Sequence, residues 1–161
     1  MIDPNSMTAR LTFKKAGLDT MGLDAAWDRA LQRYLRCETL YYGAGAFGPL
    51  AKEQERHTLE KIAIEEKFGR GWKAQSEAAK RHEVSFAGLI KAEEDHVRQF
   101  AEPYWRAANE LALTPAPSLA AAMFKAAVME HDEIDTNRDF PGECMEILQA
   151  DFARLTREAA Q

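Results

Sequence analysis

The chain has 161 residues, of which 46% are hydrophobic and 29% are charged, and these values are typical of one soluble globular domain. Its formal net charge of −5 argues against a nucleic-acid partner, because affinity for a phosphate backbone comes from lysine and arginine side chains. No run of about 18 apolar residues occurs, so no membrane-spanning helix is predicted.

The start of the chain and its two cysteines indicate the cellular compartment of the protein. Residues 1–6 look like a remnant of an expression vector ahead of a natural start at Met7, so we assign residues 7–161 to a single domain. No charged segment followed by an apolar leader is present, and we expect a cytoplasmic protein. In that compartment Cys37 and Cys144 are expected to be reduced and buried.

Hydrophobic residues spaced three and four apart predict helices through most of the chain. Residues 7–21 lack clear periodicity and are interpreted as a lead-in. The first clear stripe predicts a helix that ends at Gly43, and it consists of Leu23, Trp27, Ala30, Tyr34, Cys37 and Tyr41. The glycines and proline of residues 43–49 are predicted to break this helix, and a more polar helix is predicted over residues 51–68.

Residues 72–101 predict one long helix, which is the central element of the expected fold. Its apolar positions are Phe86, Leu89, Ile90, Val97 and Phe100. Because the segment is much longer than an average helix, we expect it to bend or break near Gly88. Pro103 is predicted to kink or restart it, because the proline ring clashes with the preceding turn.

The C-terminal part predicts a proline-marked corner at residues 114–118 and two further helices. Ser118 is suited to cap the helix that begins at Leu119. The last helix has the most regular stripe, formed by Met145, Leu148, Phe152, Leu155 and Ala159. No segment alternates with a period of two, so the sequence predicts an all-α fold, a bundle of about five helices with one long, kinked central helix.

Residues 43–48 match the Gly-x-Gly-x-x-Gly spacing of dinucleotide-binding loops, and Glu65 or Glu66 follows near the expected distance. Such a loop needs a buried strand before it and a helix after it, within a parallel sheet. Here a helical stripe precedes the glycines, and Pro49 follows the last one. We therefore interpret this segment as a connection between helices.

Glutamate and histidine residues form the strongest candidate for a chemical site. Glu93 and His96 stand three apart on one side of the long helix, and Glu93 falls within its apolar arc, where a carboxylate needs a counter-charge or a metal. Glu130 and His131 lie in the next helix, and Glu130 is aligned with its apolar positions. Carboxylates and histidines of this kind bind metals in ferritin-like bundles, so iron, manganese or zinc is the cofactor alternative.

Two observations favour an ordinary structural role for these residues. The ferritin-like class needs two Glu-x-x-His pairs, whereas the chain has one, and the adjacent Glu130 and His131 point about 100° apart. Glu93 at the edge of a stripe would pair with a lysine or arginine, and His96 would pack at the rim. A third helix offers the further candidate ligands His57, Glu53 and Glu60.

Residues 111–125 contain Thr114-Pro115-Ala116, then Leu119 and Lys125. This pattern resembles the Thr-Pro-Ala-x-x-Leu-x-x-x-x-x-Lys segment of small helical proteins from alphaproteobacterial genomes and their prophages. The long helix ahead of the corner fits their layout, and the resemblance covers the C-terminal half of the chain. It implies a bacterial or phage origin and a cytosolic location, and it transfers no activity to any residue.

The sequence contains no complete catalytic set, so we expect a non-enzymatic helical interaction or regulatory module without a cofactor. The apolar face of the 72–101 arm is expected to pair with a second copy in a homodimer, and a further protein partner is unidentified. A metal-binding bundle that uses Glu93, His96, Glu130 and His131 is the alternative. A third possibility is a ligand pocket lined by Trp27, Tyr34 and Tyr41.

Overall fold

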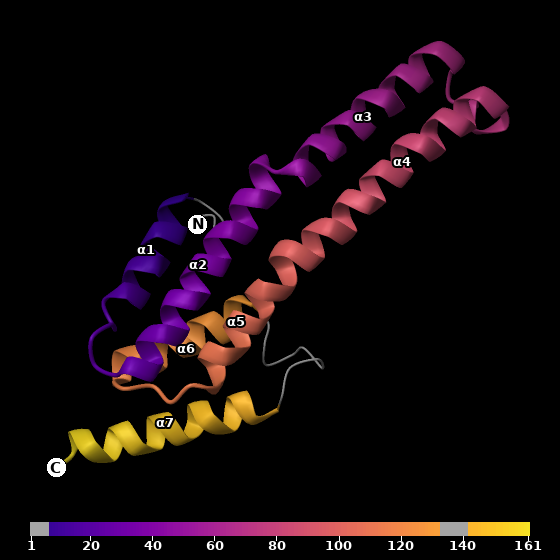
Figure 1. Cartoon of the computed structure of the whole chain (residues 1–161). Coiled ribbons are helices and arrows are strands. Elements are labelled where there is room, and N and C mark those ends of the chain that lie inside the picture. Colours follow the sequence, from indigo (N-terminus) through magenta and orange to yellow (C-terminus); the bar gives the residue numbers. More distant parts are fainter. Residues whose placement is uncertain (1–6, 133–141) are drawn as a thin grey trace. The chain divides into compact units, whose positions relative to one another are not determined.

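The computed structural model describes residues 7–132 and 142–161, and the part of the chain it describes is helical without a strand (Figure 1). This confirms the predicted all-α class. The expected vector remnant, residues 1–6, lies outside the described residues. No helix in the described ranges is long and apolar enough to cross a membrane.

The chain divides into two compact units. The first, which we call the core unit, combines Met1–Cys37 with Tyr104–Gln161, and the second, the hairpin unit, is Glu38–Pro103. Their boundaries fall inside two helices, α2 (Ala25–Phe47) and α5 (Glu102–Leu113).

The core unit contains α1 (Met7–Leu18), α6 (Leu119–His131) and α7 (Glu143–Ala159) together with parts of α2 and α5. The stripe predicted in α2 is confirmed at Trp27, Ala30 and Tyr34, which are buried, whereas Leu23 is exposed. On the partner helices, the buried apolar positions include Ala107, Ala108, Leu111, Ala121 and Val128. The small residues among them allow close approach of the helix backbones.

Residues 7–18 form a helix although their sequence lacks a clear stripe, because two residues on one side of α1 fit α6. The Phe13 ring lies 5.0 Å from the Phe124 ring, centroid to centroid. A Cβ atom at Gly17 would lie only 2.7 Å from Phe124 Cζ, so the missing side chain is what allows this approach. A tertiary contact therefore decides the structure of a segment with weak periodicity.

The predicted end of α2 at Gly43 is wrong, because the helix continues to Phe47 and the chain bends only at Gly48. Each helical glycine costs about 1 kcal/mol relative to alanine, a penalty that the surrounding helix tolerates. Pro49 begins α3 (Pro49–Phe68), where a missing N–H is harmless. Since Gly43 and Gly45 are helical, the segment cannot form a phosphate-binding loop, and only Gly48 acts as the predicted connection.

In the hairpin unit, α3 and α4 (Ser76–His96) lie side by side and run in opposite directions (Figure 1). They are joined by Gly69, which has a left-handed backbone with φ of 73°, and by the short helix η1 (Trp72–Ala74). The buried apolar cluster of this unit is small and consists of Ile64, Trp72 and Ala78, with Phe68 packed against it.

The helix α4 is continuous through Gly88, so a break there is wrong. The distortion predicted at Pro103 takes the form of a π-helical turn, η2 (Val97–Ala101), through which α4 continues directly into α5. The Glu102 N–H donates to the carbonyl of Val97, five residues earlier. Because Pro103 has no N–H and its ring crowds the preceding turn, this wider turn lets the helix pass the proline.

The corner before α6 agrees with its prediction. The Ser118 side chain accepts a hydrogen bond from the Ala121 N–H at 3.2 Å and caps α6. In α7, Leu148 and Leu155 are buried as predicted.

Candidate functional site

The four residues predicted to bind a metal fall into two pairs, one in each unit. Glu93 and His96 belong to the hairpin unit, and Glu130 and His131 belong to the core unit. Within the described residues, no group of three or more histidine, cysteine, aspartate or glutamate side chains is placed to hold a metal ion.

Glu93 lies in line with Phe86, Ile90 and Val97, as the helical spacing predicts, but this face of α4 is exposed rather than buried. Its carboxylate is therefore hydrated and requires neither a counter-charge nor a metal. His96 packs its ring against Tyr41 and Phe100, each at 5.4 Å between centroids. The expectation of a carboxylate within a buried apolar arc was wrong, because the arc faces solvent.

The other candidate metal ligands are either exposed or have partners within the protein. Glu130 is exposed, and His131 Nδ1 lies 2.8 Å from Asp132 Oδ1. In α3, each candidate ligand has a partner: His57 Nδ1 lies 3.0 Å from Ser85 Oγ, Glu53 pairs with Arg56, and Glu60 pairs with Arg81.

The surface feature that distinguishes the hairpin unit is a row of apolar side chains on α4. This row consists of Phe86, Ile90 and Val97, which we call the apolar stripe, and these residues are 46%, 37% and 39% exposed to solvent. With Glu93 between them, they are spaced four, three and four residues apart, so they share one helix face. This spacing is typical of a face that packs against another helix.

The interface between α3 and α4 contains polar contacts as well as the small apolar cluster. The hydrogen bond between His57 and Ser85 and the Arg81–Glu60 ion pair at 2.8 Å lie along it. Meanwhile the unit leaves many large apolar side chains exposed, namely Leu40, Phe47, Leu59, Ile62, Val84, Phe86, Ile90 and Val97. The hairpin unit therefore buries few of its own large apolar residues.

No protein-family model matches the chain, and no curated protein or solved structure matches it either. The side chains of the two units are therefore the basis for assigning a function.

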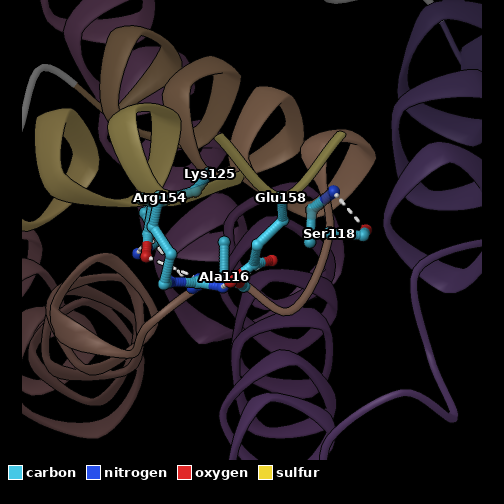
Figure 2. Close-up of polar contacts among 7 residues, drawn as sticks. Ala116, Ser118, Lys125, Arg154 and Glu158 are labelled. Atoms are coloured by element: carbon cyan, nitrogen blue, oxygen red, sulfur yellow. Dashed lines mark hydrogen bonds and ion pairs between the residues drawn. The ribbon is translucent and has the colours of Figure 1, made fainter. Parts of the chain in front are cut away.

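A buried ion pair in the core unit is the most unusual chemical feature of the chain, and the sequence did not predict it (Figure 2). The side chain of Lys125 in α6 is 0% exposed and that of Asp151 in α7 is 4% exposed, and Nζ lies 2.6 Å from Oδ2. The same Oδ2 accepts the Ala116 N–H at 2.9 Å. Arg154 donates to the Ala116 carbonyl and to Asp151 Oδ1, so one carboxylate holds the corner against both helices.

This cluster gives a structural reason for the Thr-Pro-Ala and lysine pattern of residues 114–125. Ala116 from the corner and Lys125 from α6 both meet Asp151. Burial lowers the pKa of Lys125, and the hydrogen bond that its ammonium donates to Asp151 opposes that shift. Since Lys125 is fully enclosed, no substrate reaches its amine, and the cluster serves to fix the corner.

The two cysteines are free thiols. Cys144 is buried as predicted and donates to Asn109 Oδ1 at 3.3 Å, whereas Cys37 is only half-buried. Burial raises the pKa of the Cys144 thiol, which disfavours the reactive thiolate.

A histidine pair near the tip of the hairpin unit should make this unit sensitive to acid. His82 lies 4.8 Å from the Trp72 ring and 5.2 Å from the His57 ring. Burial lowers the pKa of His82 below its ordinary value of 6.5, and the positive charges of His57, Lys61 and Lys73 lower it further. The unfolded chain therefore takes up this proton more readily, and we expect the stability of the hairpin to fall as the pH decreases below about 6.5.

Urea unfolding at pH 7.5 and pH 5.5 would test this expectation. The His82→Phe variant keeps an aromatic ring and removes the titrating group, so it should lose less stability between the two pH values. An equal loss in both proteins would contradict the assignment to His82.

Proposed function

We propose that the protein acts by association rather than by catalysis, as a helical interaction module, and that its hairpin unit pairs with the hairpin unit of a second copy. The observation that carries this proposal is the exposed apolar stripe on a hairpin with a small core of its own. Pairing would remove Phe86, Ile90 and Val97 from water, which is worth about 25 cal/mol for each Å² of apolar surface buried.

The dimensions of the hairpin suit a stable homodimer. A helix of about 20 residues is about 30 Å long, and two adjacent helices are about 20 Å wide. A face of this size is comparable to the area of about 800 Å² that each partner buries in a standard protein interface. The two hairpins would then form a four-helix arrangement.

The position of Glu93 favours antiparallel pairing of the two α4 helices. In a parallel pair, the two Glu93 carboxylates would face each other across the interface and repel. In an antiparallel pair whose axis passes between Ile90 and Glu93, each Glu93 faces Ile90 of the other copy, so the two carboxylates do not meet. Phe86 and Val97 then face each other across the interface. We therefore assign the two-fold axis of the dimer to the neighbourhood of Ile90.

The substitution Ile90→Glu should convert the dimer to a monomer, because it places two like charges at the centre of the interface. The mass in solution, measured by light scattering after size-exclusion chromatography, should fall from about twice 18.1 kDa to 18.1 kDa. Val84→Glu is the matched control, because Val84 is also exposed on α4 but lies about 200° around the helix from Phe86.

Circular dichroism should show that both variants keep the helical content of the parent. A parent that is monomeric at tens of micromolar concentration would contradict the proposal. Loss of the dimer in Val84→Glu would also contradict it, because the interface would then lie on another face.

A further inference from the structure

A cavity of about 320 Å³ lies between α3 and α4 beside the π-helical turn. We propose that it binds a small organic anion, one with a flat apolar body and a single carboxylate. Its apolar lining residues include Leu50, Ala92 and Phe100. The polar lining residues are Glu53, Arg56, Lys91, Asp95, His96 and Gln99.

The shape of the cavity follows from two features of α4. Gly88 lacks a side chain, and a Cβ atom there would lie 2.4 Å from Arg56 Nη2, so the guanidinium rests directly on the helix and closes one end. At the other end, Gln99 and Phe100 belong to the π-helical turn. Turns of this kind are frequent at functional sites, because they redirect side chains within a helix. The volume suits a molecule of about 10 to 15 non-hydrogen atoms.

The charges around the cavity indicate the sign of the ligand. The Glu53 carboxylate is paired with Arg56 at 2.6 Å, and the Asp95 carboxylate is paired with Arg98. Lys91 has no ion-pair partner among the described residues. When Arg98, which lies outside the lining, is counted with its partner Asp95, the charge left uncompensated around the cavity is the Lys91 ammonium. This charge favours a monoanion over a cation.

Two neutral side chains can complete the recognition of a carboxylate. Neither the ring nitrogens of His96 nor the Gln99 amide makes a hydrogen bond within the described part of the chain. Both groups can donate, and they lie one turn or more beyond Lys91 on the same helix. A pocket with apolar walls and a few convergent polar groups is the usual form of a small-molecule site.

The cavity and the apolar stripe lie on different sides of α4, so the two proposals can fail separately. Asp95 lines the cavity and Phe86 belongs to the stripe, and these residues are nine positions apart. At about 100° per residue, that spacing places them on opposite sides of the helix. The monomeric variant Ile90→Glu should therefore keep the ligand site.

The probe for this site is 2-naphthoate, and its neutral analogue 2-naphthamide has nearly the same shape without the charge. Isothermal titration calorimetry should show that the parent protein binds 2-naphthoate more tightly than 2-naphthamide. Lys91→Met should weaken naphthoate binding about threefold to tenfold and leave naphthamide binding unchanged, since it removes one exposed charge and keeps the apolar stem. Lys52→Met, which removes an exposed lysine of α3 outside the cavity, is the matched control.

A second variant tests the location of the site by filling it. Ala92→Leu adds a branched side chain to the wall and should abolish binding of both probes, while circular dichroism confirms that the helices persist. Absence of naphthoate binding at millimolar concentration would overturn the proposal. Equal affinity for the two probes, or equal effects of Lys91→Met and Lys52→Met, would overturn the role of Lys91 and with it the anionic ligand.

Discussion

Replacing Asp151 with alanine should lower the free energy of unfolding by about 3–5 kcal/mol, because it leaves the buried Lys125 ammonium without its counter-charge. The same change removes the acceptor of the Ala116 N–H and one partner of Arg154. Urea denaturation followed by circular dichroism would measure the loss. Asp151→Asn should cost less, because the amide oxygen can still accept from Ala116.

The matched control for this variant is Glu110→Ala, which breaks the exposed ion pair with Arg33 at 2.7 Å. Exposed pairs contribute at most about 1 kcal/mol, so a small effect is expected there. The second substitution Lys125→Met should restore part of the stability lost in Asp151→Ala, because it replaces an unpaired buried charge with an apolar chain. Similar losses in Asp151→Ala and Glu110→Ala would contradict a dominant role for the buried pair.

The pH dependence of the Asp151→Ala variant provides an independent check. The folded-state pKa of Lys125 is already lowered by burial, and loss of the aspartate lowers it further. The unfolded chain then binds more protons than the folded chain between this lowered pKa and the ordinary value of 10.5, so stability rises with pH across that interval. The stability difference from the parent should therefore narrow as the pH is raised from 7 towards 10.

Trp27→Ala should destabilise the core unit by about 3–5 kcal/mol, the usual cost of removing a large aromatic side chain from a packed interior. Trp27 is fully buried, and its indole N–H donates to Thr20 Oγ1 at 2.9 Å. The Thr20 hydroxyl in turn donates to the Gly17 carbonyl, so the indole also fixes the end of α1.

Trp105→Ala removes the same kind of side chain from an exposed position in the same unit and should change stability by less than about 0.5 kcal/mol. Both variants can be compared by urea unfolding under identical conditions. If Trp27→Ala lowered the free energy of unfolding by less than about 1 kcal/mol, the space left by the indole would collapse without penalty. That result would contradict the close packing of Trp27 in the core unit.

Helical periodicity was sufficient to predict the all-α class, because apolar spacing is a direct consequence of burial on one face. It correctly placed Trp27 and Tyr34 in the interior and Leu148 and Leu155 on the buried side of α7. It also placed the end of α3 at Phe68 and the start of α6 at Leu119. It misplaced the end of α2, because a glycine costs a helix only about 1 kcal/mol and the neighbouring helical turns override that preference at Gly43.

The candidate sites could be predicted only in part, because the sequence does not show which apolar face is covered. The alignment of Glu93 with Phe86 and Ile90 was right, but the conclusion that Glu93 is buried was wrong. The sequence did contain a signal for the Lys125–Asp151 pair, because each charged residue interrupts an apolar stripe. Lys125 lies between Phe124 and Val128, and Asp151 lies between Leu148 and Leu155. Pairing two such interruptions from separate helices needs the tertiary contact between α6 and α7.

The division of the core unit between two distant stretches of chain has a consequence for folding kinetics. Tyr34 and Tyr104 flank the inserted Glu38–Pro103 segment, and their rings lie 5.9 Å apart in the folded core unit. The hairpin brings its own two ends together, since Tyr41 meets His96 near them. Each halving of a loop lowers its closure cost by about 0.6 kcal/mol, so a hairpin that forms first greatly shortens the loop that the core unit must close. We expect the inserted hairpin to act as a folding nucleus, and substitutions at its tip should slow the folding of helices they never touch.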